Sequence, residues 1–490
     1  MRRAALLWLG FLGLSGCSSE GADWALPHVR VPQHPELAPN GRNNMHNDAY
    51  MSDTYELDGP AGLAPEVLSR SYAEGVNTCT TLVFDAADRV ITTSASMLSF
   101  TILLVDPVSL ESLAAYPLPP RDPFDPLFPY DDTSGAAYFA LDRQGRILFS
   151  DAENAVQLVR YSDERQAFRQ LARFDLSAHV AAREPPSRDH VQMAMPDWDG
   201  RHLWFTTRYG RVGTLEESSG QVRTHELTGE EIENSFAVGE DGVYVVSDHA
   251  LYRFSAGPDG APRVDWRTAY DRGTRVKPGN FNQGSGTTPH LFPDMVAIAD
   301  NAEPRMNVLF VRRADGQVAC QLPVFPEGLG TTENALPGLA RRGPRGLEYS
   351  VLVDNNYGIR RDNILGEGRA WADHVGGLVR VDMLPEEGGG YRCAEVWASP
   401  ERSSQVLPKI SLSNGLVYLY TYQRRQDGEY DFFLTALDFA TGQTRFSVPT
   451  GAGLEYANFG SPLALGPDGG AYLGTLGGLV KVMDGQAAPR

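Results

Sequence analysis

The sequence predicts an all-β protein built from repeated four-stranded units. From residue 78 to the C-terminus, short apolar runs alternate with tight turns, and helical periodicity is almost absent. Glycine accounts for 50 of the 490 residues, as expected for a chain with many turns. One unit recurs: an apolar strand, a turn rich in Asp, Asn or Gly, and a second strand that carries Val, Ile or aromatic residues.

The turns of this unit recur at nearly constant spacing. Successive turns are separated by 56, 55, 42, 53, 50, 70 and 54 residues, and they lie at Asp88, Gln144, Asp199, Asp241, Asp294, Pro344, Asn414 and Asp468. Eight units of this period favour an eight-bladed β-propeller over residues 78–490, with four strands in each blade. The longest separation contains an insertion near 357–376, which we expect in a loop.

Both ends of the propeller are expected to share its last blade. After the turn at Asp468 only two strands remain, at Ala471–Thr475 and Leu479–Met483, so the eighth unit lacks a strand. Residues 44–77 precede the first unit, and the run Pro65–Ala73 within them has no place in it. We therefore expect this run to complete the eighth blade, which leaves no exposed sheet edge. An open solenoid, the alternative, explains neither the missing strand nor the additional one.

One segment resembles a known repeat. Residues Ala436–Phe446 are similar to the tryptophan-docking repeat of quinoprotein propellers, A-x-D-x-x-T-G-x-x-x-W, with Phe446 in place of the tryptophan. The resemblance implies a tight turn at Gly442 and an aromatic side chain wedged between blades. In quinoprotein dehydrogenases a vicinal cysteine pair covers the cofactor PQQ, and this chain has no adjacent cysteines. PQQ is therefore not expected as a cofactor.

The N-terminus resembles a bacterial lipobox. Two arginines precede the apolar run Ala4–Leu14, and the sequence Leu-Ser-Gly-Cys ends at Cys17. This resemblance implies that residues 1–16 are a signal peptide and that Cys17 carries acyl chains, which hold the protein permanently on a membrane. Ser18 after the cysteine resembles the sorting pattern for the outer membrane of the bacterial cell envelope, rather than for the inner membrane.

The segment after the cysteine is expected to be a tether. Residues 17–43 are polar and contain four prolines, which favours a semi-extended chain. The polar run Asn43–Asp48 that follows either lies across one mouth of the propeller channel or continues the tether, and both alternatives stay open.

Charge and cysteine content narrow the partners and the compartment. The net charge is −19 and no Lys/Arg cluster occurs, which argues against a nucleic-acid partner. Three cysteines follow Cys17, namely Cys79, Cys320 and Cys393, without the spacing of a metal site. Cys320 and Cys393 occupy similar places in neighbouring repeats, so a disulfide between them suits an oxidising envelope. Three buried thiols are the simpler alternative.

Polar residues gather next to the first strands of the blades, where a propeller lines its central channel. The candidate ligand-binding residues are Glu233, Asn234, His290, Asn301, Asn334 and Asn355, and the candidate calcium ligands are Asp300, Glu333 and Asp354. Oxygens of this kind converge on calcium in lactonase-like propellers. The alternative is that these residues cap turns and bond to their own backbone, as Asn and Asp do at most strand ends.

Two functions follow from these observations. The first is an envelope-anchored lipoprotein whose propeller is a binding or scaffolding surface for a protein or glycan partner. The second is an enzyme that uses the channel mouth, either a calcium-dependent hydrolase of the lactonase type or an oxidoreductase. We favour the first, because the mature sequence contains no HExxH, P-loop, Rossmann or GxSxG motif.

Overall fold

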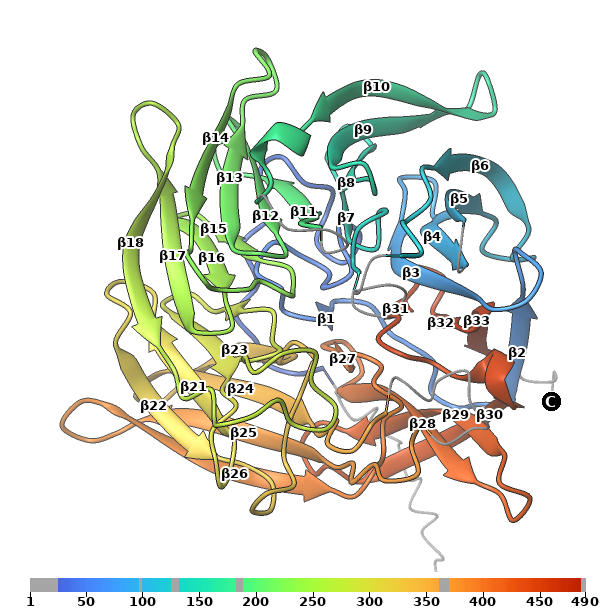
Figure 1. Ribbon diagram of the computed structural model, residues 1–490. Helices are drawn as coiled ribbons and strands as arrows, with labels where there is room; N and C mark the ends of the chain where they lie inside the picture. The colour runs from blue at the N-terminus through green and yellow to red at the C-terminus, as the bar shows by residue number, and fades with distance from the viewer. Residues whose placement is uncertain (1–24, 97–98, 125–131, 182–187, 361–369, 486–490) are drawn as a thin grey trace, which may run out of the picture.

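The computed structural model describes residues 25–96, 99–124, 132–181, 188–360 and 370–485, and these are almost entirely β-structure. Four-stranded antiparallel sheets lie around a common centre, as in a β-propeller, and the strands of a sheet follow one another outward from that centre (Figure 1). Within these ranges the helices are short 3-10 turns, η1 (Ser177–His179) and η3 (Leu454–Tyr456). No helix there is long and apolar enough to span a membrane.

The strands fall into successive groups along the chain. The first two sheets contain β3 (Asn77–Phe84), β4 (Val90–Ser96), β5 (Phe100–Val105) and β6 (Ser112–Leu118), then β7 (Phe139–Leu141), β8 (Arg146–Ser150), β9 (Ala155–Ser162) and β10 (Ala167–Asp175). The next two contain β11 (Val191–Pro196), β12 (Leu203–Thr207), β13 (Arg211–Leu215) and β14 (Val222–Glu226), then β15 (Ala237–Gly239), β16 (Gly242–Val246), β17 (Ala250–Ala256) and β18 (Pro262–Ala269).

The remaining strands form four further groups. They are β19 (His290–Leu291), β20 (Met295–Ala299), β21 (Asn307–Arg312) and β22 (Val318–Pro323), then β23 (Gly338–Gly343), β24 (Gly346–Asp354), β25 (Leu378–Pro385) and β26 (Tyr391–Ser399). The seventh group is β27 (Lys409–Ser411), β28 (Leu416–Arg424), β29 (Tyr430–Asp438) and β30 (Thr444–Ala452), and β1 (Thr54–Tyr55) pairs in parallel with β27. The last group is β31 (Leu463–Leu465), β32 (Ala471–Thr475) and β33 (Gly477–Asp484) with β2 (Pro65–Arg70).

All eight turns identified in the sequence join the first strand of a sheet to its second. The turn at Asp88 lies between β3 and β4, and the turn at Asp468 lies between β31 and β32. The predicted insertion near 357–376 falls in the connection between β24 and β25, and residues 361–369 of it lie outside the described residues. The spacing therefore identified the register of the repeat correctly.

The N-terminal strand β2 pairs with the C-terminal strand β33. Their antiparallel register runs from Pro65 opposite Asp484 to Arg70 opposite Leu479. Strand β3 also touches β33, in parallel, at Asn77 opposite Gly477, so residues from both ends of the chain share one continuous sheet. The strand ends at Arg70, three residues before the end of the predicted run.

Aromatic side chains wedge between neighbouring sheets in one repeated arrangement. Trp397 of β26 packs on Gly442, where a Cβ would lie 2.5 Å from the indole, and donates its N–H to the Phe439 carbonyl at 3.0 Å. Trp266 of β18 does the same in an earlier sheet, since its indole donates to the Arg313 carbonyl at 2.8 Å. Phe446, the aromatic of the quinoprotein-like segment, packs in the same way on Gly62 in the segment before β2, where a Cβ would lie 2.6 Å from the phenyl ring.

The segment expected to be a tether is part of the fold from residue 25 onward. We call residues 25–55 the N-terminal strap, because they cross the inner strands of successive sheets. Backbone amides on these strands donate to strap carbonyls in five sheets: Leu141 to Asn43, Val238 to Ala49, Leu291 to Tyr50, Gly338 to Ser52, and Ile410 to Asp53. The polar run Asn43–Asp48 therefore lies across one mouth of the channel. Its residues are mostly buried.

A disulfide joins Cys320 on β22 to Cys393 on β26. The alternative of three separate buried thiols is therefore wrong for these two cysteines. Their Cα atoms are 6.0 Å apart and 73 positions separate them in the chain. Cys79 is a buried free thiol, and burial raises its pKa to about 12. The bond therefore links the outer strands of two neighbouring sheets.

Replacing both Cys320 and Cys393 with serine is expected to lower the free energy of unfolding by about 2–4 kcal/mol, because the bond restricts a long loop of the unfolded chain. Urea titration of the oxidised protein and of the double variant measures this difference. Reduction of the unaltered protein should reproduce the loss. The Cys79→Ser variant serves as the comparison, and equal midpoints for the oxidised protein and the double variant would contradict a stabilising disulfide.

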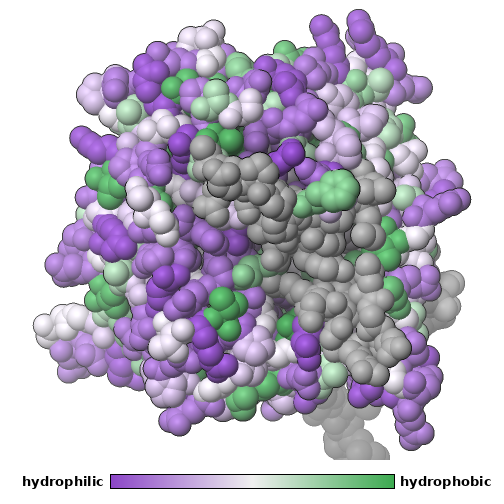
Figure 2. All heavy atoms as spheres, in the orientation of Figure 1, coloured by the Kyte–Doolittle hydropathy of each residue, from purple (hydrophilic) through white to green (hydrophobic). Residues whose placement is uncertain are grey.

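The face of the ring seen in Figure 1 is predominantly hydrophilic. Figure 2 shows apolar residues scattered over it singly, without one continuous apolar patch among the coloured residues. Scattered apolar residues are normal for a protein surface. The apolar side chains gather instead between the sheets, for example in the cluster around Phe84, Tyr418 and Tyr472.

Candidate functional site

The strap is fixed to the ring by a buried ionic cluster. Lys409 at the start of β27 and Asp53 of the strap have no exposed side-chain surface, and their charged groups are 2.5 Å apart. His46 contacts the same carboxylate at 3.0 Å through Nδ1. Burial alone would raise the pKa of Asp53, but the ammonium of Lys409 and the imidazole of His46 hold it below its ordinary value. Lys409 also donates to the Met45 carbonyl.

A cavity of about 250 Å³ lies in the channel above the strap. Strap residues Met45 and His46 line it from one side, and residues of β3, β4 and β5 and of loops between strands line the rest. Apolar side chains make up much of the wall, including Phe100, Phe281, Leu407, Phe459 and Leu476. An apolar cavity with a few polar groups is the usual form of a small-molecule site.

Two glutamates carry the polar part of this cavity. Glu233 precedes β15 and Glu333 precedes β23, and their exposed fractions are 7 % and 8 %. Phe281 donates its backbone N–H to Glu333 Oε1 at 2.9 Å. Burial raises the pKa of Tyr138, and the charges of both glutamates raise it further, so the three side chains share one electrostatic environment. Two carboxylates and a phenol therefore face the channel together.

An arginine–aspartate pair lies on another part of the wall. Arg121 Nε is 3.4 Å from Asp132 Oδ2, and the guanidinium lies 4.2 Å from the centre of the Phe100 ring. Burial alone would raise the pKa of Asp132, but the charge of Arg121 holds it below the ordinary value. The pair flanks the loop from Arg121 to Asp132, of which residues 125–131 lie outside the described residues.

The structure brings together four of the candidate residues. Glu233, Asn234, Glu333 and Asn334 all line the cavity. Asn334 also donates from Nδ2 to Asp354 at 2.8 Å, and Asn355 bonds from Nδ2 to the Leu329 carbonyl at the same distance. Both contacts reach residues 20 or more positions away in the chain, so they are not the bonds to the local backbone that the turn-capping alternative predicts.

The three candidate calcium ligands do not form one site. Asp300 accepts the backbone and side-chain N–H groups of Asn307 at 2.6 and 2.7 Å, within its own sheet. Asp354 accepts from Asn334 and Asn356 instead. Burial raises the pKa of Asp300 and of Asp354 to about 6 in each case. In the described part of the chain, no group of three or more His, Cys, Asp or Glu residues has a metal-binding arrangement.

Asn301 and His290 lie away from the cavity. Asn301 Nδ2 is 3.3 Å from the Gln283 carbonyl. Burial lowers the pKa of His290 to about 4, so the ring is neutral and donates from Nδ1 to the Leu336 carbonyl at 2.7 Å. It stacks on Phe292 with the ring centroids 4.1 Å apart. His290 is thus a satisfied structural histidine, as a lone histidine beside a strand usually is.

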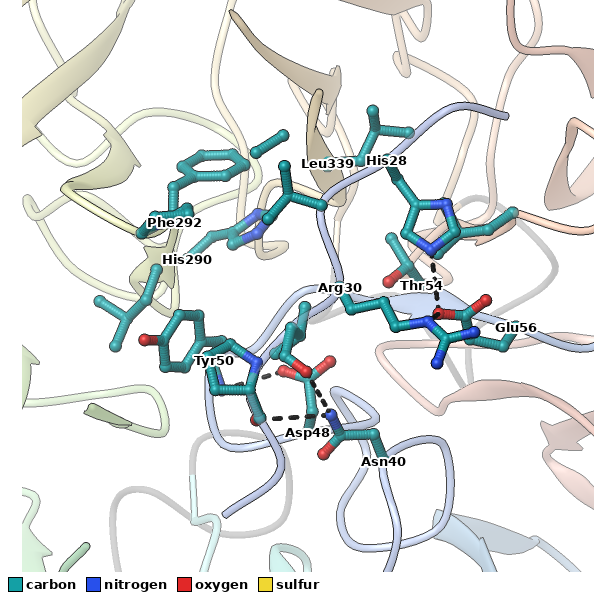
Figure 3. Close-up of a pocket in the computed structure, with 18 of the residues that line it drawn as sticks. His28, Arg30, Asn40, Asp48, Tyr50, Thr54, Glu56, His290, Phe292 and Leu339 are labelled. Atoms are coloured by element: carbon teal, nitrogen blue, oxygen red, sulfur yellow. Dashed lines mark hydrogen bonds and ion pairs between the residues drawn. The ribbon is translucent and has the colours of Figure 1, made fainter. Parts of the chain in front are cut away.

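A second cleft, of about 460 Å³, lies between the strap and the inner strands (Figure 3). His28, Arg30 and Glu56 lie at one edge, where His28 Nε2 is 2.9 Å from Glu56 Oε1. Tyr50 and His290 lie across the cleft from this edge. Asp48 is buried beneath, accepts the backbone N–H of Tyr50 at 2.9 Å, and has a pKa that burial raises to about 7. The cleft therefore lies where the strap packs against the ring.

Several residues of the site carry no signal in the sequence. Lys409 and Asp53 are single charged residues in ordinary surroundings, and Tyr138 is one of 20 tyrosines. Their roles depend on which strand ends meet in the channel, and spacing along the chain does not give that information. The position of Asn43–Asp48 directly before the repeat was the one available signal for the strap.

Comparisons with known proteins give weak similarities. No family model matches the chain, and no curated protein is similar to it. BamB from Moraxella catarrhalis is 12 % identical over 87 % of this chain and 99 % of that one, with a TM-score of 0.45. Virginiamycin B lyase from Staphylococcus aureus is 8 % identical over 86 % of this chain and 99 % of that one, with a TM-score of 0.35. A chain of the mitotic checkpoint complex is 11 % identical over 70 % of this chain and 87 % of that one, also with a TM-score of 0.35. The fold assignment therefore rests on the strand pairing.

Proposed function

We propose that the protein is a lipoprotein of the bacterial cell envelope whose propeller binds a ligand or partner without transforming it. The channel cavity carries this proposal, because it combines an apolar wall with a few buried polar groups and has the strap as a fixed floor. We also infer eight four-stranded blades, with β2 as the fourth strand of the last one. The pairing of β2 with β33 and the eight regularly spaced turns support this count.

The anchor is proposed at Cys17, which lies outside the described residues, with the outer membrane as its location. Seven residues separate Cys17 from the first residue of the strap, so the eight Cα–Cα steps between them reach at most ~28 Å. Such a short connection would hold the strap face of the ring towards the membrane. The channel mouth opposite the strap would then face away from the lipid, where a ligand can enter.

Cys17→Ala is expected to release the protein from membranes without changing its melting temperature, because attachment depends on the acyl chains and the ring needs no lipid. Fractionation after a salt wash measures the release. Cys79→Ser is the control, since it removes a thiol but leaves the lipobox intact. A Cys17→Ala variant that still sediments with washed membranes would contradict the proposed anchor.

The cavity is tested by filling it. Ala137 is a half-buried residue of the cavity wall, and Ala137→Phe should exclude a bound ligand while leaving the strap contacts in place. Native mass spectrometry of protein purified from its own host should show an additional mass on the unaltered chain that is lost from this variant. Ala87→Phe, in an exposed turn, is the matched control. The same mass on all three proteins would place the ligand elsewhere, and no mass on any of them would contradict a resident ligand.

A calcium-dependent enzyme of the channel is the second candidate, since Glu233, Glu333 and Tyr138 offer carboxylates and a phenol in one place. Calcium that binds the folded state raises the melting temperature by mass action. Thermal melts with and without calcium therefore distinguish the two candidates. A specific rise that Glu333→Gln abolishes would favour the enzyme.

A further inference from the structure

A long groove runs between the sheet β11–β14 and the sheet β15–β18. Four turns form it, one after the first and one after the third strand of each sheet, and its volume is about 1070 Å³. In an up-and-down sheet these turns lie at the end opposite to the connections that line the channel cavity. Glu36 of the strap lies against Gly200 in the first turn, which places the groove on the strap face.

Carboxylates dominate the walls of this groove. Seven of them line it, against the guanidinium groups of Arg201 and Arg223, and they are Asp197, Asp199, Glu216, Glu217, Glu240, Asp241 and Asp259. Three arginines that do not line the groove reduce its excess of negative charge. Arg146 pairs with Glu217, Arg253 pairs with Asp241, and Arg313 pairs with both Glu240 and Asp241. Within the described ranges, Glu216 and Asp259 lie in no ion pair, so the groove keeps a negative charge. We call it the acidic groove.

The crowding of these acids is visible in Asp197 and Asp199. Burial raises the pKa of Asp197, and the neighbouring carboxylate of Asp199 contributes to this rise. Arg201, 2.5 Å from Asp199, offsets part of the charge, and His202 Nδ1 contacts Asp197 at 3.0 Å. A cation that entered the acidic groove would relieve the repulsion that remains.

The floor of the acidic groove is apolar and contains a second, independent feature. Val238, Val243, Phe254 and Trp204 line it. The side chain of Trp204 is 2 % exposed, and its indole N–H has no acceptor among the described residues. Buried indole N–H groups nearly always find an acceptor, because an unmade bond costs free energy. The tryptophans wedged between sheets from the outer strands β18 and β26, Trp266 and Trp397, do donate to a carbonyl of the adjacent sheet.

We propose that the acidic groove binds an extended, basic segment of a partner protein. Its arginine or lysine side chains pair with Glu216 and Asp259, and a backbone carbonyl accepts the N–H of Trp204. An extended segment suits the groove because its side chains alternate between two sides. This site is separate from the channel cavity, so either proposal can fail without the other.

The test uses a fluorescein-labelled peptide in which arginine and leucine alternate, measured by fluorescence anisotropy with the full chain. The double variant Glu216→Gln/Asp259→Asn should bind this peptide about five to ten times more weakly, as expected for the loss of two exposed charge pairs. The matched control Glu386→Gln/Glu387→Gln removes the same charge from an exposed turn between β25 and β26. It should leave the affinity unchanged.

Two further measurements make the test specific. A peptide with glutamate in place of arginine should not bind, and added salt should weaken binding of the basic peptide. Trp204→Phe keeps the apolar floor but removes the indole N–H. It should weaken binding of the basic peptide, and added salt should weaken binding to this variant as much as it weakens binding to the unaltered chain. Equal affinity of the unaltered chain and the Glu216→Gln/Asp259→Asn variant would overturn the proposal, as would equal losses in both double variants.

Discussion

Lys409→Met is expected to lower the free energy of unfolding by about 3–5 kcal/mol, because it leaves the carboxylate of Asp53 buried without its cation. Neither side chain has exposed surface, so water cannot replace the lost partner. Lys409 also donates to the Met45 carbonyl and to Asn47, and methionine of similar length makes neither bond. Chemical denaturation of the variant and of the unaltered chain measures the loss.

Two controls separate this effect from a general loss of packing. The double variant Asp53→Asn/Lys409→Met removes both charges and should recover a large part of the stability, since a neutral pair no longer carries the cost of a buried charge. Arg345→Met breaks an exposed ion pair with Glu387 and should cost less than about 1 kcal/mol. A single Lys409→Met variant that is no less stable than Arg345→Met would contradict the anchoring role of the pair.

Replacing β2 with a glycine–serine segment of equal length is expected to destabilise the protein by about 3 kcal/mol or more, because net backbone hydrogen bonds of about 1 kcal/mol each are lost along β33. Six residues of β2 are in register with β33, and Val67 packs against the core cluster. The uncovered edge of β33 is also a template for pairing between molecules, so aggregation should accompany the loss.

The matched control is the same replacement in residues 18–23, which precede the strap. It alters the chain by the same length and should leave the melting temperature unchanged, because residues 18–23 are a short polar run of Ser, Glu, Gly, Ala and Asp, which is typical of a linker. Light scattering during thermal unfolding follows aggregation in both variants. Equal melting temperatures for the two replacements would contradict the proposed closure of the last blade by β2.

Much of the fold follows from the sequence because a repeat determines its own register. Turns at Asp88 through Asp468 mark the first hairpin of each sheet, and the segment Pro65–Ala73 stands out because the repeat has no place for it. The tether prediction failed from residue 25 onward for a physical reason. Proline-rich polar chain is typical of solvent-exposed linkers, but the strap buries its polar groups by bonding them to inner-strand amides, and composition does not report such partners.

The candidate site was predictable in part. Glu233, Asn234, Glu333 and Asn334 do line one cavity, since residues before the first strand of a blade must face the channel. Asp300 and Asp354 lie instead at the end of the second strand of their sheets, β20 and β24, and bond within those sheets. The difference depends on side-chain direction at each strand end, which a pattern of residue types does not specify. Lys409 could not be identified for the same reason.

The strap also determines the order in which the molecule can fold. Residues 25–55 are synthesised first, yet their partners are Leu141, Val238, Leu291, Gly338 and Ile410, which the ribosome adds much later. The strap must therefore wait until five sheets exist, and contacts between such distant parts of a chain form slowly. During that interval its buried polar residues and the open channel are both exposed to other molecules. Partly folded chains with such exposed surfaces are prone to aggregate, so we expect this protein to be most vulnerable to aggregation before the strap binds.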